Sequence, residues 1–151
     1  MGVLHYPKKG RANMIISREI DYAIRIVYIL ADNKMKSMQE ICMAEHRIPG
    51  AFAYKIIKKL EQARIVESFR GVNGGYRLVK KISELTLFDI MGINKNALEV
   101  QGYLHRHNSG MHNRKCSVSE EFKRLENTLA AAFREKTLAQ IFNMNVQHVP
   151  E

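Results

Sequence analysis

A glycine-rich stretch between two short apolar runs constrains the fold more than any other feature of the sequence. The stretch is Arg70 to Gly75, which holds three glycines, and the flanking runs are residues 65–69 and 76–79. Glycine adopts positive φ angles without steric cost, so it is favoured at the tip of a hairpin. We therefore expect two antiparallel strands joined by a wide, flexible tip.

Helical periodicity precedes this hairpin. Over residues 20–31 the apolar positions recur at intervals of three and four, which predicts a helix over about residues 18–32. Ser37 and Glu40 have the spacing of a capping box, so a second helix is expected to begin near Met38.

The third predicted helix follows Pro49 and has two different sides. Its apolar side is formed by Ala53, Ile56, Ile57 and Leu60. Its opposite side begins with a small residue and becomes basic, through Ala51, Lys55, Lys58 and Gln62. From Lys55 to Lys81 the chain has eight basic and two acidic residues, so six of its nine net positive charges lie in this helix and the hairpin. A solvated lysine face would explain the helix alone, but the basic hairpin after it favours a binding surface.

Length and composition limit the classes of protein to consider. At 151 residues the chain suits one compact domain with an added dimerisation element. No run of about 18 apolar residues is present, so no membrane partner is expected. A net charge of +9 favours a polyanionic partner such as nucleic acid. Two cysteines cannot form a disulfide framework and no secretory signal is evident, so we expect the cytoplasm.

A basic helix followed by a basic, glycine-tipped hairpin is the arrangement of a winged helix-turn-helix. In that fold the helix enters the major groove of DNA, and the hairpin, or wing, contacts phosphates or the minor groove. The residues expected to contact double-stranded DNA are Ala51, Tyr54, Lys55, Lys58, Arg70, Asn73 and Arg77. A nucleotide-binding glycine loop is a weaker interpretation, because neither GxGxxG nor GxxxxGK[ST] is present. A winged helix that binds RNA or protein would carry similar charge and stays open as an alternative.

A long helix is expected near the C-terminus. Its apolar residues recur at steps of four and three, as in a coiled-coil seam, through Val118, Phe122, Leu125, Leu129 and Ala132. The seam needs a partner, either the first helix of the same chain or the same helix of a second subunit. Capping signatures at Thr86 and Thr137 predict short helices before and after this long one.

The fold class expected is therefore mainly α with a small β-hairpin, a winged helix-turn-helix with a long C-terminal dimerisation helix. The expected divisions are a basic extension (1–13), the winged domain (14–85), a short helix and sensor loop (86–118), the dimerisation and terminal helices (119–143) and a tail (144–151).

Candidate metal ligands gather in the polar stretch before the long helix. They are Cys116, His105, His107 and His112. Imidazole and thiolate are ligands for zinc and transition metals, but this spacing is not that of a standard site, and a solvent-exposed loop is the commoner meaning. No nucleophile with a base and no paired carboxylates are organised, so no enzyme is expected.

The order of these motifs resembles the Rrf-two family of bacterial regulators over about residues 14–142. The resemblance is carried by Asp21 to Arg25, Tyr54 to Leu60, Arg70-Gly71, Gly74 to Leu78 and Leu85 to Leu87. It implies a homodimeric winged-helix repressor or activator that binds a palindromic operator. The long helix would form the dimer seam, and each recognition helix would occupy a major groove.

Two departures from the family pattern concern a turn and the sensor loop. Arg64 stands where the family usually ends its recognition helix with glycine, so we expect the local turn to differ. Cluster-binding members carry three cysteines before the long helix, whereas here Cys116 matches the last, and Leu104 and Gly110 replace the others. Asp21 matches a carboxylate that serves some members as a cluster ligand. The cofactor is thus not predicted, and a mixed-ligand cluster or metal remains an alternative.

Overall fold

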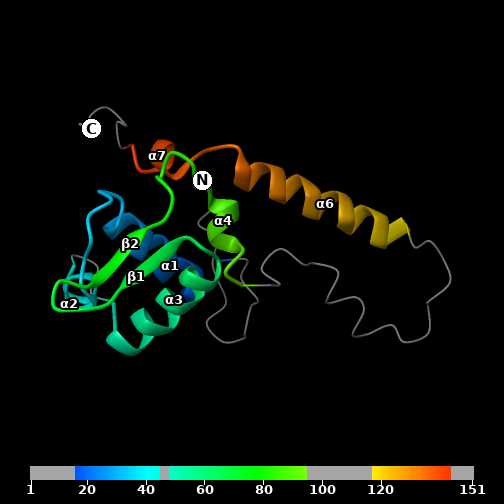
Figure 1. Ribbon diagram of the computed structural model, residues 1–151. Helices are drawn as coiled ribbons and strands as arrows, with labels where there is room; N and C mark the ends of the chain where they lie inside the picture. The colour runs from blue at the N-terminus through cyan, green and yellow to red at the C-terminus, as the bar shows by residue number, and fades with distance from the viewer. Residues whose placement is uncertain (1–15, 45–47, 95–116, 144–151) are drawn as a thin grey trace, which may run out of the picture.

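The computed structural model describes residues 16–44, 48–94 and 117–143. Its elements are α1 (Arg18–Ile29), α2 (Met38–Met43), α3 (Gly50–Gln62), β1 (Val66–Phe69), β2 (Gly75–Leu78), α4 (Leu87–Met91), α6 (Ser117–Arg134) and α7 (Leu138–Ile141). The mainly helical class with a small hairpin is confirmed. Figure 1 shows α1 to α4 gathered around the hairpin, with α6 extending from them as a long arm.

The core lies between α1, α3 and α4. The buried residues of α1 are Ile20, Ala23, Ile26 and Val27, and those of α3 are Ala53, Ile56, Ile57 and Leu60. The apolar side predicted for the third helix is therefore the side that is buried. Leu138 and Ala139 of α7 extend the same core, whereas no described side chain of α6 is buried.

The hairpin has a third, very short neighbour that the sequence did not indicate. Strands β1 and β2 pair antiparallel, and β2 also pairs with the segment between α1 and α2. Lys36 N–H donates to the carbonyl of Tyr76 at 3.0 Å, and Tyr76 N–H donates back at 2.8 Å. A Cβ on Gly75 would lie 2.6 Å from the Lys36 carbonyl oxygen, so this close backbone approach requires glycine.

The helix starts follow the predicted capping signatures. Ser37 N–H donates to the Glu40 carboxylate at 2.7 Å, and Thr86 N–H donates to the Asp89 carboxylate at 2.8 Å. Both are capping boxes, which satisfy amides that the first helical turn leaves free. Two boundaries differ from expectation. The first helix is expected to reach about residue 32 but ends at Ile29, and the long helix is expected to begin at 119 but begins at Ser117.

The end of α3 corrects the expectation about Arg64. This residue adopts a left-handed φ of 56°. Its N–H donates to the carbonyl of Glu61 at 2.9 Å, and Ile65 N–H donates to that of Leu60 at 2.9 Å. These two bonds form a Schellman motif, so the turn that glycine would favour is kept with an arginine in it. The expectation of a different turn is wrong.

We expect Arg64→Gly to raise the free energy of unfolding by about 0.5–1 kcal/mol. A side chain in left-handed geometry costs about 1–2 kcal/mol, and the extra backbone entropy of unfolded glycine offsets part of that gain. Urea denaturation at one protein concentration measures the change. Arg64→Ala is the control, since it removes the same charge but keeps the Cβ; equal stabilisation in both variants would contradict the backbone explanation.

Candidate nucleic-acid interface

The exposed side of α3 carries the residues predicted to contact DNA. Ala51, Tyr54, Lys55 and Lys58 are all exposed, on the side of the helix opposite its buried residues. At about 100° per residue, Ala51 and Lys58 lie at the centre of this side, while Lys55 and Tyr54 lie on opposite flanks. The exposed side of α3 thus has Lys58 at its centre, an aromatic residue on one flank and a second lysine on the other.

The Tyr54 flank faces the hairpin. Burial raises the pKa of the Tyr76 hydroxyl, and neighbouring Tyr54 and Glu61 act in the same direction. Tyr54 itself is 59% exposed, so its ring is available to a ligand lying across both α3 and the hairpin.

The two arginines of the wing differ in their surroundings. Arg70 and Asn73 at the tip are exposed, and Arg70 forms no salt bridge within the part of the chain that the structure describes. Arg77 donates to the Glu67 carboxylate at 2.9 Å, and its guanidinium lies 5.0 Å from the centre of the Phe69 ring. The sequence pattern does not distinguish the two arginines, but among the described residues Arg77 has an acidic partner and Arg70 has none.

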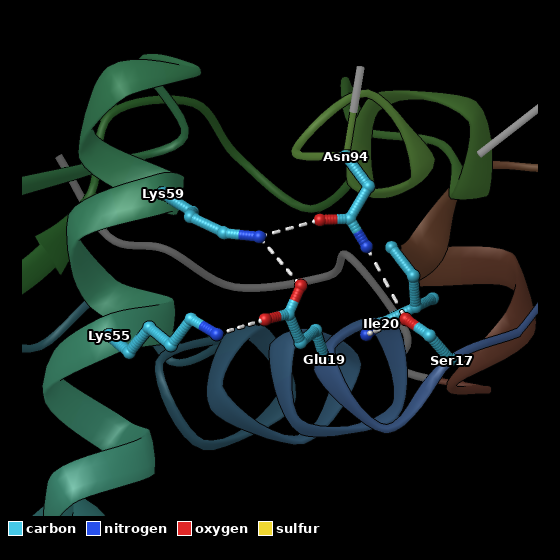
Figure 2. A network of polar contacts seen from close by, with 6 residues as sticks. All are labelled: Ser17, Glu19, Ile20, Lys55, Lys59 and Asn94. Atoms are coloured by element: carbon cyan, nitrogen blue, oxygen red, sulfur yellow. Dashed lines mark hydrogen bonds and ion pairs between the residues drawn. The ribbon is translucent and has the colours of Figure 1, made fainter. Parts of the chain in front are cut away.

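The Lys55 flank faces α1 and contains a residue that sequence reasoning missed. Figure 2 shows Glu19 between two lysines of α3. Its oxygens lie 2.6 Å from Lys55 Nζ and 2.6 Å from Lys59 Nζ. Hydrogen bonds from Lys55 and then Lys59 lower the pKa of Glu19 below its usual value, so the carboxylate is charged at neutral pH. An acidic residue in the first turn of a helix looks like an ordinary dipole partner, so the sequence carried no signal for this contact.

The long helix α6 is attached at its C-terminal end. Arg134 stacks on Phe88 of α4, with the guanidinium carbon 3.5 Å from the ring centre. The following segment is fixed by Leu138 N–H, which donates to the carbonyl of Leu85 at 2.7 Å. The helix therefore packs on α4 at this end and does not lie along α1 (Figure 1).

An apolar stripe runs along the rest of α6. Val118 is 51% exposed and Leu125 is 39% exposed, while Phe122 and Leu129 are half-buried and Ala132 is exposed. These are the five residues predicted as a seam, and the described residues of one chain leave most of this seam uncovered.

The predicted metal donors lie mostly outside the described residues, where Cys116, His105, His107 and His112 all fall. Asp21 is described; it is exposed and pairs with Arg25 Nε at 3.0 Å. Within the described ranges no group of three His, Cys, Asp or Glu side chains could hold a metal ion. No helix among these same residues is long and apolar enough to cross a membrane.

The exposed basic helix and the wing beside it define a class of protein, the winged-helix DNA-binding regulators. The chain belongs to the Rrf2 family, whose model, described as "Iron-dependent Transcriptional regulator", matches residues 16–144. This is the family that the sequence motifs resemble. It is a family of transcriptional regulators and not of enzymes.

Two relatives differ in how much of the chain they match. An HTH-type transcriptional regulator of Aquifex aeolicus (strain VF5) is 26% identical over 141 residues, which cover 90% of this chain and 96% of that protein. "Protein aau3" of Rhizobium meliloti (strain 1021) is 35% identical over 86 residues, which cover 56% of this chain and 55% of that protein. The chain thus matches about half the length of aau3.

Solved structures share the fold. CymR, described as the global cysteine regulator of B. subtilis, superposes with a TM-score of 0.64 at 19% identity, over 86% of this chain and 97% of that one. IscR of T. potens gives a TM-score of 0.64 at 18% identity, over 90% of this chain and 93% of that one. The winged-helix fold expected from the sequence is thereby confirmed.

Proposed function

We propose that the protein is a homodimeric repressor that binds a palindromic DNA operator in the cytoplasm. The observation that supports the dimer is the apolar stripe of α6, which the described residues of one chain leave largely uncovered on an arm projecting from the winged domain (Figure 1). A second copy of the same helix offers a matching stripe. Such a two-fold dimer would need its two α3 helices about 34 Å apart to enter successive major grooves, and its symmetry would call for a palindromic site.

We assign different tasks to the residues of α3 and the wing. In helix-turn-helix proteins the N-terminal residues of the recognition helix contact base edges, which gives Ala51, Tyr54 and Lys55 that role. The side chains that follow along the chain, three basic residues and one amide, are assigned to the phosphates: Lys58, Arg70, Asn73 and Arg77. Repression needs only that the bound dimer occlude a promoter, whereas activation needs an additional contact with the polymerase.

Substitutions should separate the two tasks. We expect Tyr54→Ala or Lys55→Ala to reduce the preference for the operator over random DNA, since a good base contact provides about 1–3 kcal/mol of discrimination. Lys58→Ala should weaken both duplexes alike and flatten the salt dependence. The measurement is a fluorescence titration against a duplex selected from a random library and a random duplex of equal length. The same loss on both duplexes in all three variants would contradict the assignment.

A metal-responsive form of this regulator is the second candidate, because the family description names iron. Cys116, the three histidines of the sensor loop and Asp21 are the donors it would use. Metal and sulfide analysis of anaerobically purified protein, with Cys116→Ala as the comparison, distinguishes the two candidates. Equimolar iron and sulfide that Cys116→Ala removes would favour the metal-responsive form.

A further inference from the structure

We propose that Glu19 is a specificity-determining residue, which withholds two lysines of α3 from DNA phosphates and orients one of them, Lys55, towards a base edge. The inference rests on the proposed function, in that α3 is taken to enter the major groove. Glu19 does not itself contact DNA in this arrangement. It is a positioning residue that acts through Lys55.

The geometry fixes the carboxylate from several sides (Figure 2). Each oxygen of Glu19 binds a different lysine, at 2.6 Å in both cases. Lys59 Nζ also donates to Asn94 Oδ1 at 2.7 Å, and Asn94 Nδ2 donates to Ser17 Oγ at 3.3 Å. Ser17 is the N-cap of α1, so the network joins the start of α1, the middle of α3 and the residues after α4.

Exposure distinguishes the two lysines. The Lys59 side chain is 27% exposed and that of Glu19 is 22% exposed, so this part of the network is sheltered. The Lys55 side chain is 59% exposed, although its ammonium is held by Glu19. An ammonium group has three N–H donors, so two of them stay available to a ligand. Lys59 therefore anchors the carboxylate, and Lys55 is the lysine that can reach DNA.

Charge explains why this arrangement favours specific binding. Phosphates attract any cation whatever the base sequence, and each neutralised phosphate strengthens non-specific binding at low salt. A lysine paired with a carboxylate adds little to that attraction. Of the three α3 lysines, Lys58 alone forms no salt bridge within the described residues. A fixed direction, by contrast, is what a base contact requires, because the donors and acceptors of each base pair occupy defined positions.

The test compares Glu19→Gln with Glu135→Gln, which changes the net charge equally. Glu135 follows α6, is exposed and forms no salt bridge in the described part of the chain. Glu19→Gln should free one lysine in each recognition helix to bind a phosphate. On random duplex DNA the slope of log K against log[salt] should then become steeper by about 0.9 for each helix, or about 2 for the dimer. Between 50 and 200 mM salt this amounts to about a tenfold greater loss of affinity. The preference for a library-selected duplex at 50 mM salt should fall by about tenfold, with no such change in Glu135→Gln.

Comparing Lys55→Gln with Lys58→Gln tests the role of Glu19 even if Glu19→Gln does not fold. Because Lys55 is already withheld, Lys55→Gln should change the salt dependence on random DNA much less than Lys58→Gln. Adding Glu19→Gln to Lys55→Gln should then cause no steepening. The role of Glu19 is overturned if Lys55→Gln flattens the salt dependence as much as Lys58→Gln, or if Glu19→Gln behaves as Glu135→Gln. A wild type that binds no duplex would instead refute the proposed function.

Discussion

Leu129→Glu is expected to convert the proposed dimer into monomers and to abolish binding to the proposed operator at concentrations that saturate the wild type. Leu129 is the fourth of the five residues in the apolar stripe of α6 and is only half-buried in one chain. In a dimer joined along this stripe, the substituted carboxylates would be buried without partners. An uncompensated buried charge costs about 3–5 kcal/mol, which raises the dimer dissociation constant at least about a hundredfold.

Asn127→Glu is the matched control. It places the same charge on the same helix, two residues away and therefore on the opposite, exposed side. Sedimentation velocity at micromolar concentration should show Leu129→Glu as monomer or unfolded chain and Asn127→Glu as dimer, and circular dichroism separates the first two outcomes. A monomeric wild type would refute the dimer, and dissociation of both variants would show that charge alone is responsible.

The sequence predicted those parts of the fold that local patterns determine. A helix buries the side on which apolar residues recur, so the periodicity alone assigns Ala53, Ile56 and their neighbours to the core, where the structure has them. The capping boxes are equally local, because Ser37 and Glu40 satisfy each other's backbone within one turn. The stripe of α6 is also visible in the sequence, as a pattern whose partner the sequence does not assign.

Contacts between residues that are far apart in the chain could not be predicted from the sequence in the same way. The sequence indicates Gly75 as a turn residue, but the structure shows that it also admits the backbone of Lys36. The pairing of Glu19 with Lys59 joins residues 40 positions apart, and nothing near either residue indicates the other. Arg77 resembles a free wing cation in the sequence because its pairing with Glu67 depends on the hairpin register, which a five-residue tip does not fix.

These pairings set the expected size of the salt effect. A dimer with two recognition helices and two wings that makes about 6–10 phosphate contacts loses about 10³–10⁵ in affinity between 50 and 200 mM salt. We expect the loss to lie near the lower limit, about a thousandfold. Glu19 holds both Lys55 and Lys59 and cancels one of their two charges, and Glu67 pairs with Arg77. Within the described residues this leaves Lys58 and Arg70 as the cations of α3 and the wing tip that form no salt bridge.

Fluorescence anisotropy with the selected duplex at a series of monovalent salt concentrations measures this slope. Arg70→Ala and Lys58→Ala should each flatten it by about 2 per dimer, since each removes one phosphate contact per protomer. Arg77→Ala should flatten it less, because its charge is already paired with Glu67. A flat wild-type dependence would contradict phosphate binding by this face. A slope that all three arginine and lysine variants reduce equally would show that Arg77 leaves Glu67 when DNA binds.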